Sequence, residues 1–550
     1  METKVTVEQK TPGQVFRDAF KELGETLVAF VKAPRALWGV NVPYILEGLV
    51  YFGILTILGK YSSENVQLND LYAGWVYGGV TGGITFAMLL LGGVTDKIGV
   101  RRALALAFGT MMIGRILISL SGTLSLGAGV GSPMFFMMIG GLFLMVAAYG
   151  LYQPAAYAGV KRYTNPKTAA MGYAVIYSLM NLGAFVFGPI STVTRHHFET
   201  TFPPNGLAAV FWVLTGITLL SLVLTLLLIT KRVDRRAVER VARETKEMRE
   251  KEGITGEEEE EGKKEKAAAP KRKINNNLFF VLSAVSLGTL VLLVLSLLHE
   301  IAIPYYTPLL LFIVMLTLSG MEFLRHRPDH PFRDKKFVFF IFILIPVQTL
   351  FAHNWLTIPY YLDRAFAGTW VGNNFEILSN LNPIIIFFIT PIIAGLTARA
   401  SIYRMMILGT FVMALPTFLL VSGPHAVPFV LFIAIMSIGE AMWQPRFLQW
   451  IAEIAPEGKT GAYMGIGQFP WFLTKMITSM YSGYFVARYI PMPESGLPQH
   501  TGQMWLIYAL IAMVSPLALL AAKKWMVTGM RTKAANRLIF SKLLKQVLNK

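Results

Sequence analysis

The chain has 550 residues, of which 54% are hydrophobic and only 15% are charged, whereas soluble proteins carry about 25% charged residues. Its net charge of +18 does not indicate a nucleic-acid-binding protein, because Lys and Arg lie mainly in short loops between apolar runs. Cysteine is absent, which excludes disulfides and thiolate metal sites, and the sequence has neither a phosphate-binding loop nor a histidine pattern suited to a metal, so we expect no cofactor, no metal and no enzyme activity.

The first 36 residues mix charges with bulky apolar side chains. This pattern predicts an amphipathic helix on the cytoplasmic membrane surface, with a poorly ordered tail as the alternative. Apolar segments long enough to cross ~30 Å of hydrocarbon follow. They comprise residues 37–60, 71–95, 101–123, 132–158, 167–192, 205–230, 278–298, 303–323, 336–361, 374–398, 402–422, 427–452, 459–487 and 503–527. We therefore predict an all-α polytopic membrane protein with 14 transmembrane helices.

Lys and Arg are concentrated in one set of the connecting loops. That set contains Lys97, Arg101, Arg102, Lys161, Arg162, Lys167, Arg325, Arg327, Lys335, Lys336, Arg399 and Arg404. The opposite set is poorer in bases, which are mainly Lys60, Arg195, Arg364 and Arg488. Base-rich loops stay on the cytoplasmic side of a membrane, so both termini are expected in the cytoplasm and the chain in the cell (inner) membrane. An even number of spans agrees with this placement.

Residues 231–277 differ sharply in composition from the apolar spans. They are dense in Arg, Lys and Glu, and Glu257 to Glu261 is a run of acids. Like charges in a block repel and bury nothing, which predicts a flexible cytoplasmic linker. Its first part, up to Lys251, could continue the preceding span as a solvated helix.

This linker separates six spans from eight, and six plus six is the frame of two repeat-related bundles. The surplus pair directly follows the linker and has almost no polar residues other than Ser and Thr, so lipid-facing helices are expected there. The predicted domains are an N-terminal bundle at 37–230, two extra helices at 278–323, a C-terminal bundle at 336–527 and a basic cytoplasmic tail at 528–550.

The loop between the second and third spans reads GGVTDKIGVRR. Gly92 and Gly99 allow a tight turn and close helix packing. Asp96 can meet a neighbouring helix end, while Arg101 and Arg102 hold the loop at the inner surface. This loop resembles the corresponding loop of the major facilitator superfamily, which implies that fold and a role in latching the inward gate. An ordinary basic loop is the alternative.

Five further segments follow in chain order. They are Glu47 with Tyr51-Phe52-Gly53, then Gly150-Leu-Tyr-Gln153-Pro154, then Tyr177-Ser-Leu-Met-Asn181-Leu-Gly183-Ala184, then Leu381-Asn382-Pro383 with Pro391, and finally Gly439-Glu440 with Pro445. Each resembles the matching segment of the proton-dependent oligopeptide transporters, whose bacterial members also insert two extra helices between the halves. The resemblance implies a transporter that couples small peptides to protons.

The same resemblance reveals missing bases in the first and fourth spans. Where the family usually reads Glu-x-x-Glu-Arg, this chain has Tyr44, Glu47 and Gly48. A second family arginine corresponds to Leu55, and the family lysine of span four corresponds to Gln153. Those bases are associated with the peptide carboxylate and with proton coupling in the family. The chain is therefore predicted to be a divergent relative, and transport of ordinary di- and tripeptides is not implied.

Two acids lie inside predicted spans, where an unpaired charge costs several kcal/mol. Glu47 and Glu440 are both roughly 15 Å from the inner surface at about 1.5 Å per residue. We expect them to bind substrate or protons, and by resemblance Glu440 corresponds to the acid associated with the peptide amino group. The alternatives are a fixed ion pair for Glu47 and, for Glu440, a structural pairing with Arg446 or Lys475.

Three bases also lie within spans. Lys475 is expected to replace part of the missing positive charge or, equally, to pair with one of the two acids. Arg115 is mid-span in the third helix, where a structural role is favoured. Arg446 lies nearer the inner mouth than Glu440 and is a candidate gate residue, with a side chain that reaches the headgroups as the alternative.

Uncharged side chains complete the candidate site. Amides both donate and accept hydrogen bonds, which suits recognition of a peptide backbone. The amide candidates are Asn181, Asn382, Gln153 and Gln348, and the aromatic candidates for the pocket wall are Tyr51, Tyr177 and Trp443. For each aromatic residue, helix packing or a place in an interfacial belt is the alternative.

These features together predict a secondary active transporter that moves a small polar or zwitterionic, peptide-like solute by alternating access, as a proton symporter. Its expected partners are the solute, protons and the lipid bilayer, but no nucleic acid, and a monomer is expected. Two alternatives stay open. One is a proton-independent facilitator or exporter of the same fold. The other is a non-transporting membrane sensor or scaffold that uses the charged linker for docking.

Overall fold

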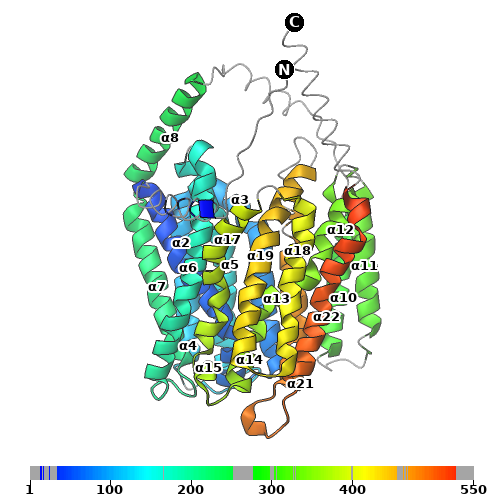
Figure 1. Cartoon of the computed structure of the whole chain (residues 1–550). Coiled ribbons are helices and arrows are strands. Elements are labelled where there is room, and N and C mark those ends of the chain that lie inside the picture. Colours follow the sequence, from blue (N-terminus) through cyan, green and yellow to red (C-terminus); the bar gives the residue numbers. More distant parts are fainter. Residues whose placement is uncertain are drawn as a thin grey trace. The chain divides into compact units, whose positions relative to one another are not determined.

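In the computed structural model of the chain, every element of the described residues is a helix (Figure 1). The chain divides into two compact units. The first comprises Met1–Met248, Ile343–Ile454 and Gly467–Lys550, and the second comprises Arg249–Phe342 and Ala455–Ile466. Apart from a few isolated positions, the structure describes residues 34–124, 126–164, 166–251, 277–297, 306–325, 330–397, 400–454 and 469–527.

Six long helices form the N-terminal half of the first unit. They are α2 (Arg35–Lys60), α3 (Asp70–Ile98), α4 (Val100–Ser121), α5 (Pro133–Tyr163), α6 (Pro166–Phe198) and α7 (Leu207–Leu228). A short π-helical turn, η1 (Tyr61–Asn65), continues α2. α4 packs along α5, and α2 packs against both α6 and α7. The buried apolar side chains of these helices form one continuous core. The polar residues of α2 therefore lie among the neighbouring helices.

The C-terminal half of the first unit is more broken. Its helices are α13 (Ile345–Leu356), α14 (Ile358–Ala365), α15 (Trp370–Asn373), α16 (Phe375–Ser379), α17 (Leu381–Leu396), α18 (Ile402–Ala414), η3 (Leu415–Ser422), α19 (Ala426–Ile454), α21 (Phe469–Tyr489) and α22 (Thr501–Ala521). Proline lacks an N–H group and begins a new helix more readily than it continues one. The span expected at 336–361 is accordingly divided into α12 (Lys335–Ile343), α13 and α14, with Pro346 and Pro359 in the first turns of the last two.

The start of the expected flexible linker is a helix, α8 (Lys231–Lys251). Asp234 fastens it to α5, since Arg162 donates two hydrogen bonds to its carboxylate at 3.0 and 3.2 Å and the Tyr163 hydroxyl donates a third at 2.8 Å. Arg35 and Arg101 also donate to backbone carbonyls at the end of α7. A helix over Lys231–Lys251 agrees with the solvated continuation of the preceding span that the sequence allowed, and the flexibility of the linker stays a prediction. The rest of the linker, most of the first 33 residues and the basic tail lie outside the described residues.

In the second unit, α10 (Asn277–Leu297) and α11 (Tyr306–Arg325) form a helical pair. The hydroxyls of Ser283 and Ser319 lie 2.7 Å apart, and most large apolar side chains of both helices are exposed. This surface suits a lipid environment. Across the described residues, nine helices are long and apolar enough to cross a membrane. The number 14 therefore stays a prediction.

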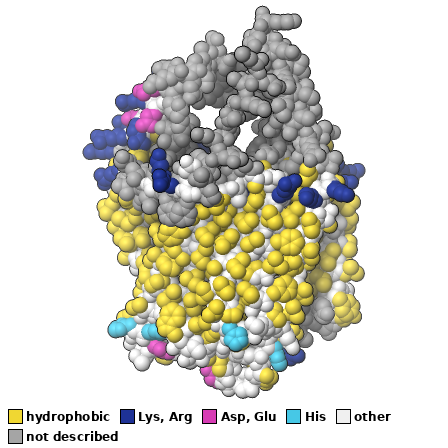
Figure 2. Space-filling model, viewed as in Figure 1, with side chains coloured by type: hydrophobic (Ala, Val, Ile, Leu, Met, Phe, Trp, Pro, Cys, Tyr) yellow, Lys and Arg dark blue, Asp and Glu magenta, His cyan; other side chains and the backbone are white. Residues whose placement is uncertain are grey.

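Apolar side chains cover the middle of the face of the first unit that Figure 2 shows. Most of the Lys and Arg side chains in view lie at one end of this apolar zone, where acidic side chains also appear, and the His side chains in view lie at the other end together with further acidic side chains. Exposed Arg102 and Lys161 belong to the base-rich end, whereas exposed His197 and Glu199 belong to the opposite end. Such a belt with charged ends is the surface expected of a protein that spans a bilayer. Below, these ends are called the base-rich end and the base-poor end.

Candidate functional site

Glu47 forms a buried ion pair with Arg115 in the N-terminal half. Arg115 of α4 donates to both carboxylate oxygens of Glu47 in α2, and the Nη1–Oε2 distance is 2.8 Å. The Tyr149 hydroxyl also donates to Glu47, and Arg115 donates to Thr218 of α7. Glu47 and Arg115 are 1% and 0% exposed. The structure thus supports the ion-pair alternative for Glu47 and a structural role for Arg115.

A small pocket lies beside this pair. We call it the tyrosine pocket. It is lined by Tyr44, Glu47, Gly48, Tyr51, Tyr149, Tyr152, Gln153 and Met180. Gly48 permits the close approach of α2 to α6, because a Cβ atom there would lie 3.1 Å from the backbone oxygen of Met180. The structure therefore brings three predicted site residues, Glu47, Tyr51 and Gln153, into one cavity.

Lys475 of α21 belongs to the C-terminal half and approaches Tyr51, one of the residues that line this pocket. Its Nζ atom lies 6.0 Å from the centroid of the Tyr51 ring. Among the described residues, no acid forms an ion pair with Lys475, in contrast to Arg115. The lysine is therefore a half-buried positive charge that the described side chains do not neutralise.

Glu440 of α19 is the acidic counterpart in the C-terminal half. It is 2% exposed, and the Asn382 amide of α17 donates to its Oε2 atom at 2.9 Å and to the Ser437 hydroxyl at 2.9 Å. Within the described part of the chain, Glu440 has no cationic partner. The predicted residues Asn382 and Glu440 thus lie in direct contact, but the carboxyl group is not compensated by a base.

Two further predicted residues lie near Lys475. The Gln348 side-chain oxygen accepts a hydrogen bond from Thr474 at 3.0 Å, and Gln348 Nε2 has no partner among the described residues. Trp443 stacks on Trp471 with ring centroids 6.2 Å apart. Trp443 is fully buried and therefore takes part in packing.

A chain of aromatic rings connects the halves. Phe52 of α2 stacks on Trp355 of α13 at 5.3 Å, and Phe351 lies 4.7 Å from Trp355 and 5.2 Å from Trp471. Tyr51 in turn lies 5.1 Å from Phe52. The rings thus extend from the tyrosine pocket towards the part of α21 that carries Lys475.

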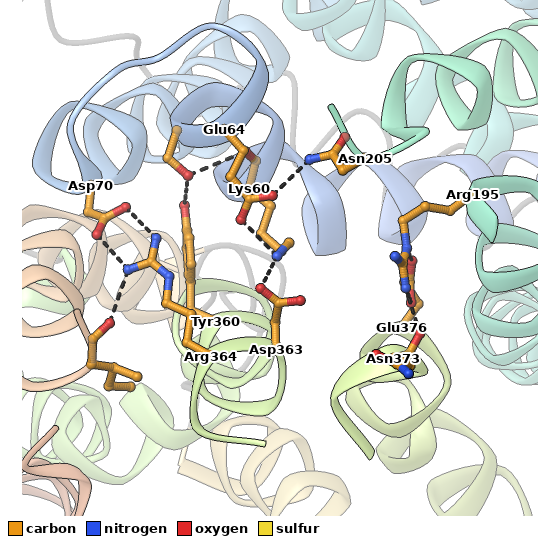
Figure 3. A network of polar contacts seen from close by, with 12 residues as sticks. Lys60, Glu64, Asp70, Arg195, Asn205, Tyr360, Asp363, Arg364, Asn373 and Glu376 are labelled. Atoms are coloured by element: carbon orange, nitrogen blue, oxygen red, sulfur yellow. Dashed lines mark hydrogen bonds and ion pairs between the residues drawn. The ribbon is translucent and has the colours of Figure 1, made fainter. Parts of the chain in front are cut away.

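Ion pairs join the two halves at the base-poor end (Figure 3). We call these contacts the outer clamp. Lys60 pairs with Glu64 at 2.8 Å and with Asp363, Arg364 donates to both oxygens of Asp70 at 2.8 and 2.9 Å, and Arg195 donates to Glu376 at 2.6 Å. Sequence reasoning did not assign these residues to a gate. The available signal was that Lys60, Arg195 and Arg364 are among the few bases at this end.

Both arginines of the clamp stay charged. Burial lowers the pKa of Arg364, but the hydrogen bonds and charge of Asp70 outweigh burial, so that the pKa is raised above its ordinary value. The pKa of Arg195 is raised in the same way, since the charge and hydrogen bonds of Glu376 outweigh burial. Neutralising a clamp arginine therefore requires breaking its ion pair.

Glycines bring α3 and α21 together beside the clamp. A Cβ atom on Gly78 would lie 2.2 Å from the Ser479 hydroxyl oxygen, and one on Gly483 would lie 2.1 Å from the backbone oxygen of Asp70. Real Cβ atoms do not approach so closely. Only a residue without a side chain therefore allows the two halves to close at these points.

The predicted gate residues are only partly described. Gly99 has φ +81°, which glycine adopts readily, and it precedes α4, while Arg101 donates to the Ile229 carbonyl at 2.6 Å. Arg102 is exposed. Arg446 of α19 donates to the Thr397 carbonyl at 2.5 Å, within the C-terminal half.

Four other predicted site residues lie on α3 and α6. Asn181 is half-buried on α6. Gly92 and Asp96 lie in α3 and Tyr177 lies in α6, but the side chains of these three positions are outside the described part of the structure. The described residues also contain no cluster of three His, Asp or Glu side chains suited to a metal ion.

Comparison with known proteins identifies the fold. The family model of the Major Facilitator Superfamily matches residues 42–352, which is more than half of the chain. A crystal structure of the peptide transporter POT in complex with sulfate superposes with a TM-score of 0.60 and 18% identity, covering 90% of this chain and 95% of that one. A POT family transporter in complex with 5-aminolevulinic acid gives a TM-score of 0.57 and 16% identity, covering 90% and 97%.

A third solved structure, described as giving insights into substrate recognition in proton dependent oligopeptide transporters, has a TM-score of 0.59 and 16% identity, and the match covers 89% of this chain and 99% of that one. No curated protein sequence matches the chain. At such identities the structural matches establish a common fold, while the family model covers most of the N-terminal half. The chain therefore belongs to the major facilitator superfamily and is a membrane transporter, not an enzyme, with a fold that resembles that of the POT family.

Proposed function

We propose that the chain is a secondary active transporter that couples protons to the movement of a small zwitterionic, peptide-like solute. The observation that carries this proposal is the pair of uncompensated charges in the C-terminal half. Glu440 has no cationic partner and Lys475 no acidic partner among the described residues. A zwitterionic solute carries an ammonium group that can pair with Glu440 and a carboxylate that can pair with Lys475.

Proton coupling follows from the surroundings of Glu440. Transfer of an unpaired carboxylate into a medium of low polarity is unfavourable, so that the carboxyl group takes up a proton unless a cation approaches. Protonation of Glu440 would neutralise this buried charge and so change which end of the transporter can close. A solute and a proton that must both be bound before the two halves rock would move in the same direction, as in a symporter.

Alternating access provides the transport step. The outer clamp and the glycine contacts of α3 with α21 close the base-poor end, so this conformation is closed on that side. Rocking of the two halves must separate Asp70 from Arg364 and Glu376 from Arg195 in every cycle. Ion pairs suit such a gate because they form only when the halves meet in one geometry.

The proposed membrane placement follows the positive-inside pattern. The base-rich end faces the cytoplasm, both termini lie there, and the outer clamp faces the outside of the cell membrane. We further propose 14 spans and a working monomer. The resemblance to structures named as peptide transporters supports a peptide-like solute.

Reconstituted proteoliposomes test the proposal. Uptake of alanyl-alanine should rise when the outer solution is acidified relative to the lumen, and Glu440→Gln should abolish that response, since glutamine cannot release a proton. Glu239→Gln on exposed α8 is the control and should leave uptake unchanged. Full gradient-driven uptake by Glu440→Gln would show that this mechanism is wrong.

The same assay separates the alternatives. A facilitator or exporter would move solute without responding to the proton gradient. A sensor or scaffold would bind a solute, seen as thermal stabilisation of the purified chain, but would show no flux in either direction.

A further inference from the structure

The first part of α8, from Lys231 to Glu239, carries positive charge that its own acids do not compensate. Both acids already have a base, since Asp234 pairs with Arg162 at 3.0 Å and Glu239 pairs with Arg235 at 3.2 Å. The exposed bases that form no ion pair with a described residue are Lys231, Arg232 and Arg236. Figure 2 shows Lys and Arg side chains gathered over α8 at the edge of the apolar zone. Such a group of like charges attracts an anion.

The helix that leads into these bases has an apolar exposed side. Leu220, Val223 and Leu227 of α7 are 47%, 41% and 59% exposed. Their spacing of three and four positions places them on one face of the helix. In a protein that spans a bilayer, such a face lies against the acyl chains of lipids. Lys231 follows Leu227 by four positions, so the bases begin where acyl chains give way to headgroups.

Hydrogen bonds from neighbouring helices hold the junction between α7 and α8 in place. Arg35 of α2 donates to the Leu227 carbonyl at 3.0 Å, and Arg101 of α4 donates to the Ile229 carbonyl at 2.6 Å. Ala237 of α8 is 7% exposed and belongs to the apolar core of the N-terminal half. The first part of α8 is therefore fixed with its bases turned outwards, and an anion that binds there meets a surface that needs little ordering.

We propose that the junction of α7 and α8 binds an anionic phospholipid. The phosphate of the headgroup lies among Lys231, Arg232 and Arg236, and the acyl chains lie along the apolar exposed side of α7. A soluble anion would use only the bases, whereas a phospholipid matches the charged and the apolar surface with one molecule. The headgroup needs a net negative charge, because the choline cation of phosphatidylcholine would be repelled by the same bases. This lipid site does not depend on the proposed transport function.

Quenching of a fluorophore on α7 tests the lipid site. The chain has no cysteine of its own, so Leu227→Cys provides a single position for the fluorophore. Leu408→Cys on α18 is the control, since Leu408 is 52% exposed and lies one turn after the single exposed base Arg404. Full-length variants are reconstituted in phosphatidylcholine nanodiscs with a minor fraction of phosphatidylglycerol or phosphatidylcholine that carries a nitroxide on an acyl chain. The ratio of quenching by the two labelled lipids measures the preference for the anionic headgroup beside the fluorophore.

Phosphatidylglycerol should be preferred about tenfold at Leu227→Cys and no more than about twofold at Leu408→Cys. The combined substitutions Lys231→Gln, Arg232→Gln and Arg236→Gln should lower the preference at Leu227→Cys to that of the control. A second triple variant removes the same charge from exposed positions farther along α8, and it should retain the preference. Its substitutions are Arg240→Gln, Arg243→Gln and Lys246→Gln.

Three results would overturn the lipid site. The first is equal quenching by the two lipids at Leu227→Cys. The second is an equal loss of preference in both triple variants, which would indicate attraction by the net charge of α8 without a site. The third is displacement of the lipid by excess glycerol phosphate but not by sodium chloride of the same ionic strength, which would indicate a site for small soluble anions. None of these measurements requires solute flux, so a failure of the proposed function would leave the result unaffected.

Discussion

Arg364 of α14 donates to both carboxylate oxygens of Asp70 in α3, at 2.8 and 2.9 Å, and so joins the C-terminal half to the N-terminal half. The side chains are only 2% and 11% exposed. Loss of one partner from such a pair leaves the other charge buried without a counter-charge, which costs about 3–5 kcal/mol. This pair is therefore expected to determine how long the base-poor end, the proposed outer end of the transporter, stays closed.

Asp70→Asn should open the outer end more often. Ser63 lies beside the clamp and is 6% exposed. Opening is measured by labelling a thiol introduced by Ser63→Cys. We expect its reaction with an impermeant maleimide to become about tenfold faster, as the lost ion pair favours the closed state by more than 1.4 kcal/mol. Arg235→Gln removes an exposed pair on α8 and should have no effect. An unchanged rate in Asp70→Asn would show that this pair does not hold the gate.

Alkaline pH should not release the arginines of the clamp. The pKa of Arg195 and that of Arg364 are raised, so the stability that each pair contributes is present below the ordinary arginine pKa and is lost only as pH rises through the still higher folded value. Ser495→Cys places a thiol in an exposed loop and corrects for thiolate formation. After this correction, labelling at Ser63→Cys should stay constant from about pH 6 to about pH 9. An increase in the labelling rate within that pH interval would show that another titratable group controls the gate.

Gly78→Leu should prevent closure of the outer end. A Cβ atom at this position would already meet the Ser479 hydroxyl at 2.2 Å, so a larger side chain forces α3 away from α21. Faster labelling at Ser63→Cys and loss of solute uptake are the expected results. Gly79→Leu is the control, because a Cβ atom there meets nothing within 4 Å. Equal behaviour of the two variants would contradict the close-packing argument.

Glu47→Gln should act mainly on stability. It leaves Arg115 buried without its counter-charge, and the expected loss is about 3–5 kcal/mol, measured as a lower temperature of thermal unfolding in detergent. Replacement of both partners, in Glu47→Leu with Arg115→Met, should recover part of that loss, since no unpaired charge remains. If Glu47→Gln unfolded like the parent chain and yet lost its response to a proton gradient, Glu47 would be a proton-coupling residue after all.

Several features follow from local sequence. Long apolar runs require helices, because the bilayer offers no partners for free backbone groups. Local motifs likewise indicated the superfamily, which the match over residues 42–352 confirmed. The divided span at 336–361 was also readable in principle, since Pro346 and Pro359 lie inside the apolar run.

Pairing between charges does not follow from local sequence. Glu47 and Arg115 are 68 positions apart, and Asp70 and Arg364 are 294 positions apart. The sequence offered Glu47 both Arg115 and Lys475 as bases within predicted spans, and only helix packing selects the partner. The same packing left Glu440 and Lys475 without counter-charges among the described residues.

The amino-acid sequence by itself thus determined that this protein crosses a membrane, where its apolar helices lie and which superfamily it belongs to, because each of these depends on residues close together in the chain. Only the tertiary structure decided that Arg115 neutralises Glu47, that a tyrosine-lined pocket lies beside them and that Arg364 closes on Asp70. The physical reason is that the energy of a buried charge depends on which side chains surround it, and helices distant in sequence supply those side chains.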